Sequence, residues 1–549
     1  MNWNNLLSEK RIRKSSIKHK RDIRNNYESD LGRIIFSPAL RRMHDKTQVF
    51  PLTDDDNIHT RLTHSNEVMS LSYTFGLKCA KSSIIQHKTG MNEADLLRII
   101  PIILQGISFI HDIGNPPFGH FAEEVIANYF DKIDCNPLIH NEVKQKFKKL
   151  TPHQKNDFKF YDGNAQGLRM ITKLQYLDDV FGMNLTYSIL GSYLKYPNSY
   201  TKEIDKSKKD ELKELKKQKK ANIAEGKHGV FHSEDKYFKK IIKECGLTDS
   251  EGRIIRHPLC FLMEAADTIA YRVMDIEDGF SKGYITINCI KEAFSKNTSE
   301  IAKTIVQKCD EPNVNDEARM IFVRIALIDY LVTLAFKNFE NNIDHIEKGK
   351  YHNELVEHDD NNIHQILSDI CKVKIFSTRE VNHLETTGYS VIKGLLNHYI
   401  NQLFNTDKKF INRATALISS SIINVALEED MLNFIALKYD KLKSEKGEII
   451  IKKKLTEKEY VTKMDDLKEK IDSYLSLILK SENDVEITYD PIKKLRTEIY
   501  KAFNDLGNQI NFQDLSDYYK LRVIVDFISG MTDKYALSHF QKISGQKIA

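Results

Sequence analysis

The chain has 549 residues, and its 82 Lys and Arg against 77 Asp and Glu give a formal net charge of +5. This near balance, with 41% hydrophobic residues, excludes a collagen, a disordered tail and a strongly basic DNA-coating protein, and it predicts a large folded core. The seven cysteines are scattered without a C-x-x-C pair, which argues against a disulfide framework and against a thiolate zinc site.

The 23 Gly and 11 Pro are few for this length, and apolar residues recur mostly at spacings of three and four. Both features predict an all-α protein. Residues 1–26 are polar and basic and lack the apolar stretch of a secretory signal, so we expect a cytoplasmic protein. Residues 96–110 are the most apolar stretch, but they contain Arg98 and Pro101 and are shorter than the ~20 residues that span a bilayer. They predict a buried helix.

We divide the chain into an N-terminal extension (1–33), a helical core (34–300) and a C-terminal helical region (301–549) that completes the fold. Residues 202–228 and 440–472 are rich in Lys and acidic residues, and we interpret both segments as surface insertions. Their Lys runs are typical of a solvated helix face. The alternative is a surface that contacts nucleic acid or phosphate.

One segment of the second insertion favours β-structure. The run Glu448–Ile451 is β-branched and follows Gly447, a turn residue. The sequence therefore predicts minor β-hairpin insertions in an otherwise helical protein.

Within the helical core, polar residues stand at the end of the most apolar helix. This helix runs into His111 and Asp112, and Gly114 followed by Pro116 then stops it. Burying an imidazole beside a carboxylate is costly unless both find a partner, and a divalent cation is one such partner.

Two other segments carry side chains of the same kind. The segment 59–68 contains Arg61 and His64, and the segment 263–279 is a predicted helix. One face of that helix carries acids and a phenol, because these residues recur at helical spacing: Glu264, Asp267, Tyr271, Asp275 and Asp278. Such a face is either exposed to solvent or lines a cavity, and its small apolar neighbours favour the cavity.

A His, then a His-Asp pair, then a distant Asp resembles the HD-domain metal-dependent phosphohydrolases. More narrowly, the chain is similar to the deoxyguanosine triphosphate triphosphohydrolase (dGTPase) family. The matching motifs occur in the family's order at 34–42 with 46–52, 60–65, 111–120, 163–169, 264–271 and 529–536. The resemblance implies an HD-type helical core over 34–300.

The resemblance also implies one divalent metal ion per active site. Its ligands would be His64, His111, Asp112 and Asp267. Two imidazoles and two carboxylates form a mixed nitrogen and oxygen set that suits Mn²⁺, Fe²⁺ or Mg²⁺.

The activity that the resemblance implies is hydrolysis of dGTP, or of other deoxynucleoside triphosphates, to the deoxynucleoside and inorganic triphosphate. His120 and Glu123 lie at i and i+3 on one helix and can point at the same spot. We expect His120 to transfer the proton and Glu123 to orient it or to hold the water. Which of the two is the acid and which is the base stays open.

Arg61 is the best candidate to bind the triphosphate, because it stands three residues before His64. By resemblance, Gln48, Tyr271 and Asp275 line the sugar. Asn164 and Gln166 lie in a Gly-flanked loop, which suits close approach to a ligand. Tyr389 either stacks on the base or gates the pocket, or it is a core aromatic residue. The full set of expected substrate-binding residues is Gln48, Arg61, Asn164, Gln166, Tyr271, Asp275 and Tyr389.

Two other functions compete with this interpretation. One is an HD-type nucleotidase or signalling-nucleotide phosphohydrolase with the same ligands. The other is a regulator that binds nucleotide or nucleic acid without turnover, which the Lys-rich run at 202–220 would support. The family also implies a homo-oligomer, such as a hexamer, and single-stranded DNA as a candidate partner.

Overall fold

The computed structural model describes residues 1–13, 22–50, 52, 57–175, 181–199, 227–482, 489–508 and 510–547. The chain is 71% helical, and no β-strand forms within these ranges. This confirms the predicted all-α fold. The predicted insertion at 202–228, except for its last two residues, lies outside the described residues.

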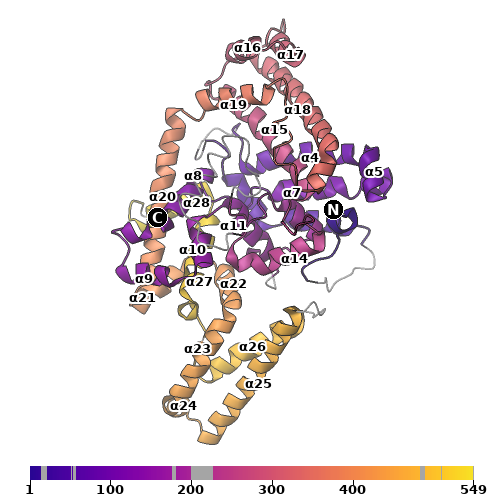
Figure 1. The fold of residues 1–549 in the computed structure, drawn as a ribbon. Helices are drawn as coiled ribbons and strands as arrows, with labels where there is room; N and C mark the ends of the chain where they lie inside the picture. Colours follow the sequence, from indigo (N-terminus) through magenta and orange to yellow (C-terminus); the bar gives the residue numbers. More distant parts are fainter. Residues whose placement is uncertain are drawn as a thin grey trace.

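The largest hydrophobic core surrounds α7 (Ile100–Ile110), which lies at the centre of the helical body (Figure 1). Ile103 and Ile107 are completely buried, and Pro101 occupies the first turn, where its missing N–H costs no helical hydrogen bond. The buried helix predicted over 96–110 is therefore confirmed, although it begins at Ile100. The helices that contribute to this core are α1 (Trp3–Leu6), α2 (Asn26–Ile35), α3 (Pro38–Arg42), α4 (Arg61–Lys81), α5 (Ser83–Thr89), α6 (Glu93–Leu96), α7, α11 (Gly163–Arg169), α12 (Tyr187–Tyr193), α14 (Asp235–Cys245), α15 (Pro258–Ser281), α16 (Ile287–Ser295), α17 (Glu300–Cys309), α18 (Asp316–Glu347), α19 (Ile363–Lys374) and the start of α20 (Arg379–Leu403).

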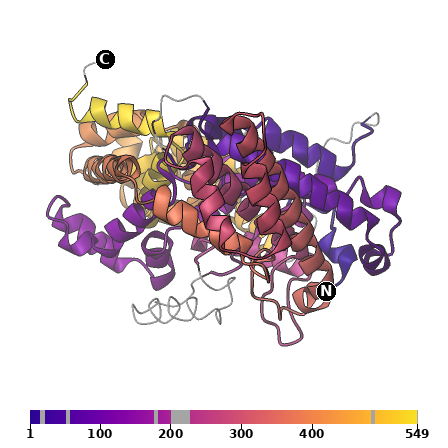
Figure 2. The ribbon, with the colours of Figure 1, turned by 90° about the horizontal axis from the view of Figure 1, so that it is seen from above.

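A second core joins helices that are far apart in the sequence, because α20 packs against both α8 and the C-terminal helices α27 and α28. The two ends of the chain lie on opposite sides of the molecule (Figures 1 and 2). Among the described residues, no single helix has the length and hydropathy to span a membrane; α21 and α22 meet that test only as a pair, bent by 114°. The helices of this core are α8 (Gly119–Asp131), α9 (Asn141–Lys149), α10 (Pro152–Lys159), α11 (Gly163–Arg169), α20 (Arg379–Leu403), α21 (Lys408–Ala416), α22 (Ser420–Glu429), α27 (Asp517–Ser529) and α28 (Asp533–Ile543).

The third core belongs to an arm of four helices that projects from the body (Figure 1). These helices are α23 (Met431–Ser444), α24 (Lys446–Lys453), α25 (Glu457–Glu482) and α26 (Tyr489–Asp505). Phe434, Leu467, Ile499 and Phe503 are completely buried at its centre. The segment 440–472 thus packs within the hydrophobic core of the arm. The predicted domain boundaries stay a prediction.

The predicted β-hairpin at Glu448–Ile451 is wrong, because this run lies inside helix α24. Ile449 is buried in the core of the arm, whereas Ile451 is 80% exposed. Helical geometry turns only one face of the run toward α23 and α25, so packing on two neighbouring helices overrides the β-propensity of the isoleucines.

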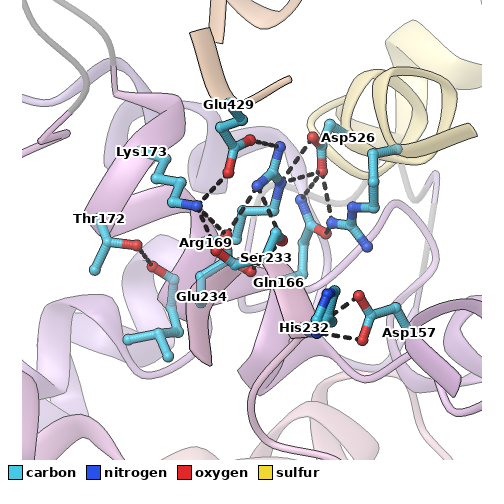
Figure 3. A network of polar contacts seen from close by, with 12 residues as sticks. Asp157, Gln166, Arg169, Thr172, Lys173, His232, Ser233, Glu234, Glu429 and Asp526 are labelled. Atoms are coloured by element: carbon cyan, nitrogen blue, oxygen red, sulfur yellow. Dashed lines mark hydrogen bonds and ion pairs between the residues drawn. The ribbon is translucent and has the colours of Figure 1, made fainter. Parts of the chain in front are cut away.

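A buried ionic network joins α11 (Gly163–Arg169) and the five-residue π-helical turn after it to α22 at the base of the arm and to α27 (Figure 3). Arg169 is fully buried and lies 2.8 Å from Glu234 and 2.8 Å from Asp526. Its third partner is Glu429, at 2.9 Å. Three cations face three carboxylates in this network, namely Arg169, Lys173 and Arg522 against Glu234, Glu429 and Asp526. The buried charges are therefore balanced.

Replacing Arg169 with Met should destabilise the fold by about 3–5 kcal/mol, because it leaves buried carboxylates unpaired. The free energy of unfolding in urea measures the effect. Arg253→Met, whose side chain is 63% exposed in an ion pair, is the matched control and should cost ~1 kcal/mol or less. A loss no larger than that of the control would contradict the importance of the network.

Candidate functional site

Helix α4 brings the first imidazole to the site. Thr60 caps the helix, since its side chain accepts the N–H of Thr63 and the Thr63 side chain returns the bond. The helix therefore begins at Arg61, and His64 follows in its first turn, buried. The Nε2 atom of His64 lies 3.1 Å from Oδ1 of Asp267.

The second imidazole stands at the end of α7. Nδ1 of His111 lies 2.6 Å from the carbonyl oxygen of Ser108 and donates its proton to it, so Nε2 is the nitrogen that can bind a metal when the ring is neutral. That Nε2 atom is buried without a hydrogen-bond partner, 3.5 Å from Oδ1 of Asp267. An orphaned imidazole nitrogen that faces a carboxylate oxygen is the arrangement of a metal ligand.

Helix α15 supplies the carboxylate that both imidazoles face. One ligand atom from each of His64, His111 and Asp267 lies within 4.8 Å of the other two. Two neutral nitrogens and one anionic oxygen fit a divalent cation with mixed ligands. The structure thus brings together three of the four predicted metal ligands in one group.

Asp112, the fourth predicted ligand, lies beside this group. Its Oδ1 is 3.8 Å from Nε2 of His111 and accepts a hydrogen bond of 2.8 Å from the Asn115 amide. Its Oδ2 pairs with the Arg61 guanidinium. Burial opposes ionisation of Asp112, but the charge of the Arg61 guanidinium outweighs it and holds the pKa of Asp112 below its usual range. The side chain is therefore a carboxylate, as a ligand must be.

The loop between α7 and α8 needs glycine at two positions of close approach. A Cβ at Gly114 would lie 2.1 Å from the backbone oxygen of Gly163. Gly119 has a φ of 63°, and its Cβ would lie 2.6 Å from Nη2 of Arg61. Only glycine lets the loop fold directly onto α11 and lets Arg61 pass beneath the start of α8.

Helix α8 begins at Gly119 and presents the predicted proton-transfer pair. Nδ1 of His120 lies 3.0 Å from Oε1 of Glu123, and the carboxylate of Glu123 raises the pKa of His120. Glu123 is buried, whereas the His120 side chain is 68% exposed. Glu123 therefore holds an imidazole that has an open face toward solvent.

The residues predicted to line the sugar gather on α15 and on the segment before α4. Tyr271 and Asp275 follow Asp267 at one-turn intervals of α15. Burial, followed by the charge of Asp278, raises the pKa of Asp275 to about 8. Oε1 of Gln48 is buried without a partner. An unsatisfied acceptor of this kind calls for a ligand donor.

Asn164 is half-buried in the first turn of α11. Its side-chain amide donates to Asp162, and its backbone carbonyl accepts a hydrogen bond from the hydroxyl of Tyr193. Tyr389 lies on α20 and is 44% exposed, with its hydroxyl 3.0 Å from Nζ of Lys393. Gly388 of the same helix packs against the ring of Phe118 in the α7–α8 loop. Helix α20 thus reaches the edge of the site.

Gln166 lies apart from the other predicted substrate-binding residues. Its amide donates to Asp526 at 3.0 Å and accepts from Arg522 at 3.0 Å, fully buried in the ionic network (Figure 3). Residues i and i+2 of a helix point in different directions, so Asn164 and Gln166 cannot serve the same site. We assign Gln166 to the network and not to the substrate.

Sequence reasoning missed two lysines that enter the site. Nζ of Lys195 lies 3.5 Å from Glu264 and 3.9 Å from Asp267, and Nζ of Lys227 lies 3.0 Å from Asp162 and 3.9 Å from Glu123. Both ammonium groups also contact the ring of Tyr196, at 5.8 and 5.6 Å. Lys227 stands at the end of a Lys-rich segment, so composition offered no signal that would separate it from its neighbours.

A third histidine bridges two helices beside the site. Nδ1 of His59 lies 2.6 Å from Asp278 on α15, and Nε2 lies 2.8 Å from Glu67 on α4. Burial lowers the pKa of His59, but these two hydrogen bonds outweigh it and raise the pKa to about 10. The imidazolium therefore ties the start of α4 to α15.

Comparison with known proteins finds relatives along most of the chain. Residues 459–542 match the phosphohydrolase-associated domain. A deoxyguanosinetriphosphate triphosphohydrolase-like protein of Listeria monocytogenes is 33% identical over 427 residues, which cover 76% of this chain and 87% of the relative. A protein of the same description from Pseudomonas aeruginosa is 30% identical over 73% of this chain and 85% of its own length. The deoxyguanosinetriphosphate triphosphohydrolase of Cronobacter sakazakii is 28% identical over 96% of this chain and 95% of its own.

We expect His111→Ala and Asp267→Ala to abolish binding of Mn²⁺ while leaving most of the helical signal, because the ligands lie at helix ends and faces that neighbouring helices already support. Metal analysis after dialysis, together with circular dichroism, measures both properties. Asp344→Ala on the exposed face of α18 is the control and should bind metal like the unchanged protein. Full metal occupancy in both ligand variants would contradict the site.

His59→Gln should cost about 2–3 kcal/mol of stability near pH 6, because two hydrogen bonds between charged groups are lost. The pKa of His59 is raised in the fold to about 10, so its contribution is complete below pH 6.5 and disappears as the pH rises through 10. Urea unfolding at a series of pH values should therefore show the difference shrinking between pH 7 and 10. A difference that is constant with pH would show that no imidazolium is involved.

Proposed function

The chain belongs to the deoxyguanosine triphosphate triphosphohydrolase family, and on this premise we propose that it hydrolyses dGTP to deoxyguanosine and inorganic triphosphate at the site between α4, α7, α8 and α15. The observation that carries the proposal is the convergence of His64, His111 and Asp267. Arg61 connects this group to the His120–Glu123 pair, since it pairs with Asp112 and passes beneath the start of α8. A metal site alone is compatible with many reactions, whereas a metal site beside a paired acid and base supports hydrolysis.

His64, His111, Asp112 and Asp267 would hold the divalent ion. Their mixed nitrogen and oxygen set supports Mn²⁺, Fe²⁺ or Mg²⁺ over a thiophilic metal. When bound, the ion supplies a Lewis acid for the α-phosphate. The Asn115 amide, which donates to Asp112, orients that carboxylate from outside the ligand set.

The reaction breaks the bond between the α-phosphorus and O5′ and joins a water oxygen to phosphorus. The water gives up one proton, and the departing O5′ takes one up, so that deoxyguanosine and triphosphate are released. We assign the proton for O5′ to His120. Glu123 fixes its Nδ1 and raises its pKa, which favours the protonated imidazole as the acid. The open Nε2 face is then free to donate to the nucleoside.

The triphosphate carries about four negative charges and needs cationic partners. Arg61 reaches the site from beneath the start of α8, Lys195 lies beside Asp267, and Lys227 lies beside Glu123. In this proposal the three cations surround the phosphate chain from three sides. The carboxylates that they contact keep them charged and in place before substrate arrives.

Gln48, Tyr271 and Asp275 would contact the sugar. The buried, unpartnered oxygen of Gln48 would accept the 3′-hydroxyl proton, and the ring of Tyr271 would crowd a ribose that carries a 2′-hydroxyl. Asn164 and Tyr389, at the edge of the site, would contact the base. Preference for guanine over other bases is part of the proposal.

The competing functions make different products. An HD-type nucleotidase or signalling-nucleotide hydrolase would release orthophosphate or pyrophosphate, and a binding-only regulator would release nothing. Assembly into a homo-oligomer and binding of single-stranded DNA stay predictions. The first is tested by light scattering, and the second by a titration at ~50 mM salt, where phosphate contacts are strongest.

Incubation with dGTP and Mn²⁺ should yield deoxyguanosine and triphosphate in equal amounts, resolved by ion chromatography. His120→Ala should lower kcat by about 10²- to 10⁴-fold, because the leaving group loses its proton donor. Lys227→Met should raise KM more than it lowers kcat, since a phosphate contact is lost in ground and transition states alike. Lys146→Met is the control, because the half-buried side chain of Lys146 pairs with Glu142 of α9 and lies outside the proposed site. Orthophosphate or pyrophosphate as the product would refute the proposed function.

A further inference from the structure

The turn between α27 and α28 lies against the active-site loop, although the two are 415 residues apart in the sequence. Asp533, the first residue of α28, is 2% exposed. Its Oδ1 accepts the backbone N–H of Phe118 at 2.9 Å. Its Oδ2 accepts both the N–H of Thr47 at 3.0 Å and the hydroxyl of Thr47 at 2.7 Å. One buried carboxylate therefore holds two separate segments of the site.

A buried lysine also connects the active-site loop to the turn between α27 and α28. Nζ of Lys46 donates to the carbonyl oxygen of Asn115 at 2.5 Å and to that of Ser529 at 3.1 Å. The hydroxyl of Tyr161, two residues before α11, donates to the Ser529 hydroxyl at 2.9 Å. We refer to Lys46, Thr47 and Asp533 as the clamp.

The backbone groups that the clamp holds are those that set the direction of the catalytic side chains. Asn115, held by Lys46, donates to Asp112 at 2.8 Å. Phe118, held by Asp533, has a φ of 66°, a conformation that is unfavourable for a side chain of this size. His120 follows two residues later. The clamp thus holds the loop backbone at Asn115 and Phe118. Both residues lie between the proposed metal ligand Asp112 and the proposed proton donor His120.

Capping of its own helix does not explain Asp533. Thr532 is the N-cap of α28, and its hydroxyl accepts the N–H of Tyr535. Both carboxylate oxygens of Asp533 are instead directed outside the helix, toward Phe118 and Thr47. A carboxylate that served only the helix terminus would face the helix's own N–H groups.

We propose that Asp533 and Lys46 are positioning residues for catalysis: they hold the 112–119 loop so that His120 meets the leaving group in the correct orientation. The inference rests on the proposed function for its kinetic consequence. It assigns the C-terminal motif 529–536 to the active site, where it acts through the loop and without touching substrate.

Asp533→Asn in the full-length protein tests this proposal. The amide keeps the size of the side chain but loses an acceptor, so the loop loosens. We expect kcat for dGTP to fall by about 10- to 100-fold with KM within about threefold, because orientation and not substrate affinity is lost. Hydrogen exchange measured by mass spectrometry should accelerate in peptides covering 44–50 and 112–121 and stay unchanged elsewhere.

Two further variants separate positioning from folding. Thr47→Val removes a single hydroxyl donor and should shift kcat and the exchange of the same peptides in the same direction, by a smaller factor. Asp517→Asn removes the same charge from the first position of α27 and should leave both readouts unchanged.

The outcomes are distinct. Unchanged kcat and unchanged loop exchange in Asp533→Asn would overturn the proposal. So would exchange that rises throughout the protein in Asp533→Asn while Thr47→Val behaves like the unchanged chain, because this pattern means a general role in folding. If the unchanged protein releases no triphosphate from dGTP, the proposed function fails, and exchange in the 112–121 peptides still decides whether the clamp orders the loop.

Discussion

Two imidazole nitrogens face one carboxylate oxygen where α4, α7 and α15 meet, and this contact organises the rest of the molecule. His64, His111 and Asp267 come from three separated segments; the two imidazoles are buried and the carboxylate is half-buried. Isolated polar groups in an apolar interior cost several kcal/mol. Where the three groups converge they can share a bound cation, which offsets that cost. The large core around α7 keeps the three helices in place.

The same demand for charge balance shapes the surroundings of the site. Arg61 neutralises Asp112, Lys195 lies among the acids of α15, and Lys227 lies between Asp162 and Glu123. A site arranged in this way is ready for a polyanion, since its cations are fixed before the ligand arrives and need little reorganisation. At the base of the arm, three cations and three carboxylates balance one another without an evident ligand role, so there the pairing serves the joint between arm and body.

Contacts between residues that are far apart in the sequence hold the loop between α7 and α8 in the conformation that the proposed site needs. Glycines let this loop fold onto α11 and over Arg61, and Asp533 and Lys46 hold its backbone from the C-terminal side. This arrangement gives a physical reason for a motif near residue 530 to accompany motifs near residues 60 and 111 in a single family. The C-terminal helices complete the second core, and through it they complete the site.

The helical class and the buried helix that ends at His111 follow from the sequence, because helical periodicity is a local property. The segments of the proposed site are recognised by their resemblance to the family's motifs, since a His-Asp pair on its own is common by chance. The sequence also determined that His120 and Glu123 could pair, since i and i+3 spacing fixes their separation once a helix forms. Tertiary structure alone decided the rest. Ile449 packs in a helix and not in a hairpin because α23 and α25 flank it, and Gln166 joins a buried network because its helix face meets α27. Lys195 and Lys227 reach the site through contacts with Asp267 and Glu123, which are distant from them in the sequence. These outcomes depend on which surfaces meet, and residue spacing along the chain carries no information about that.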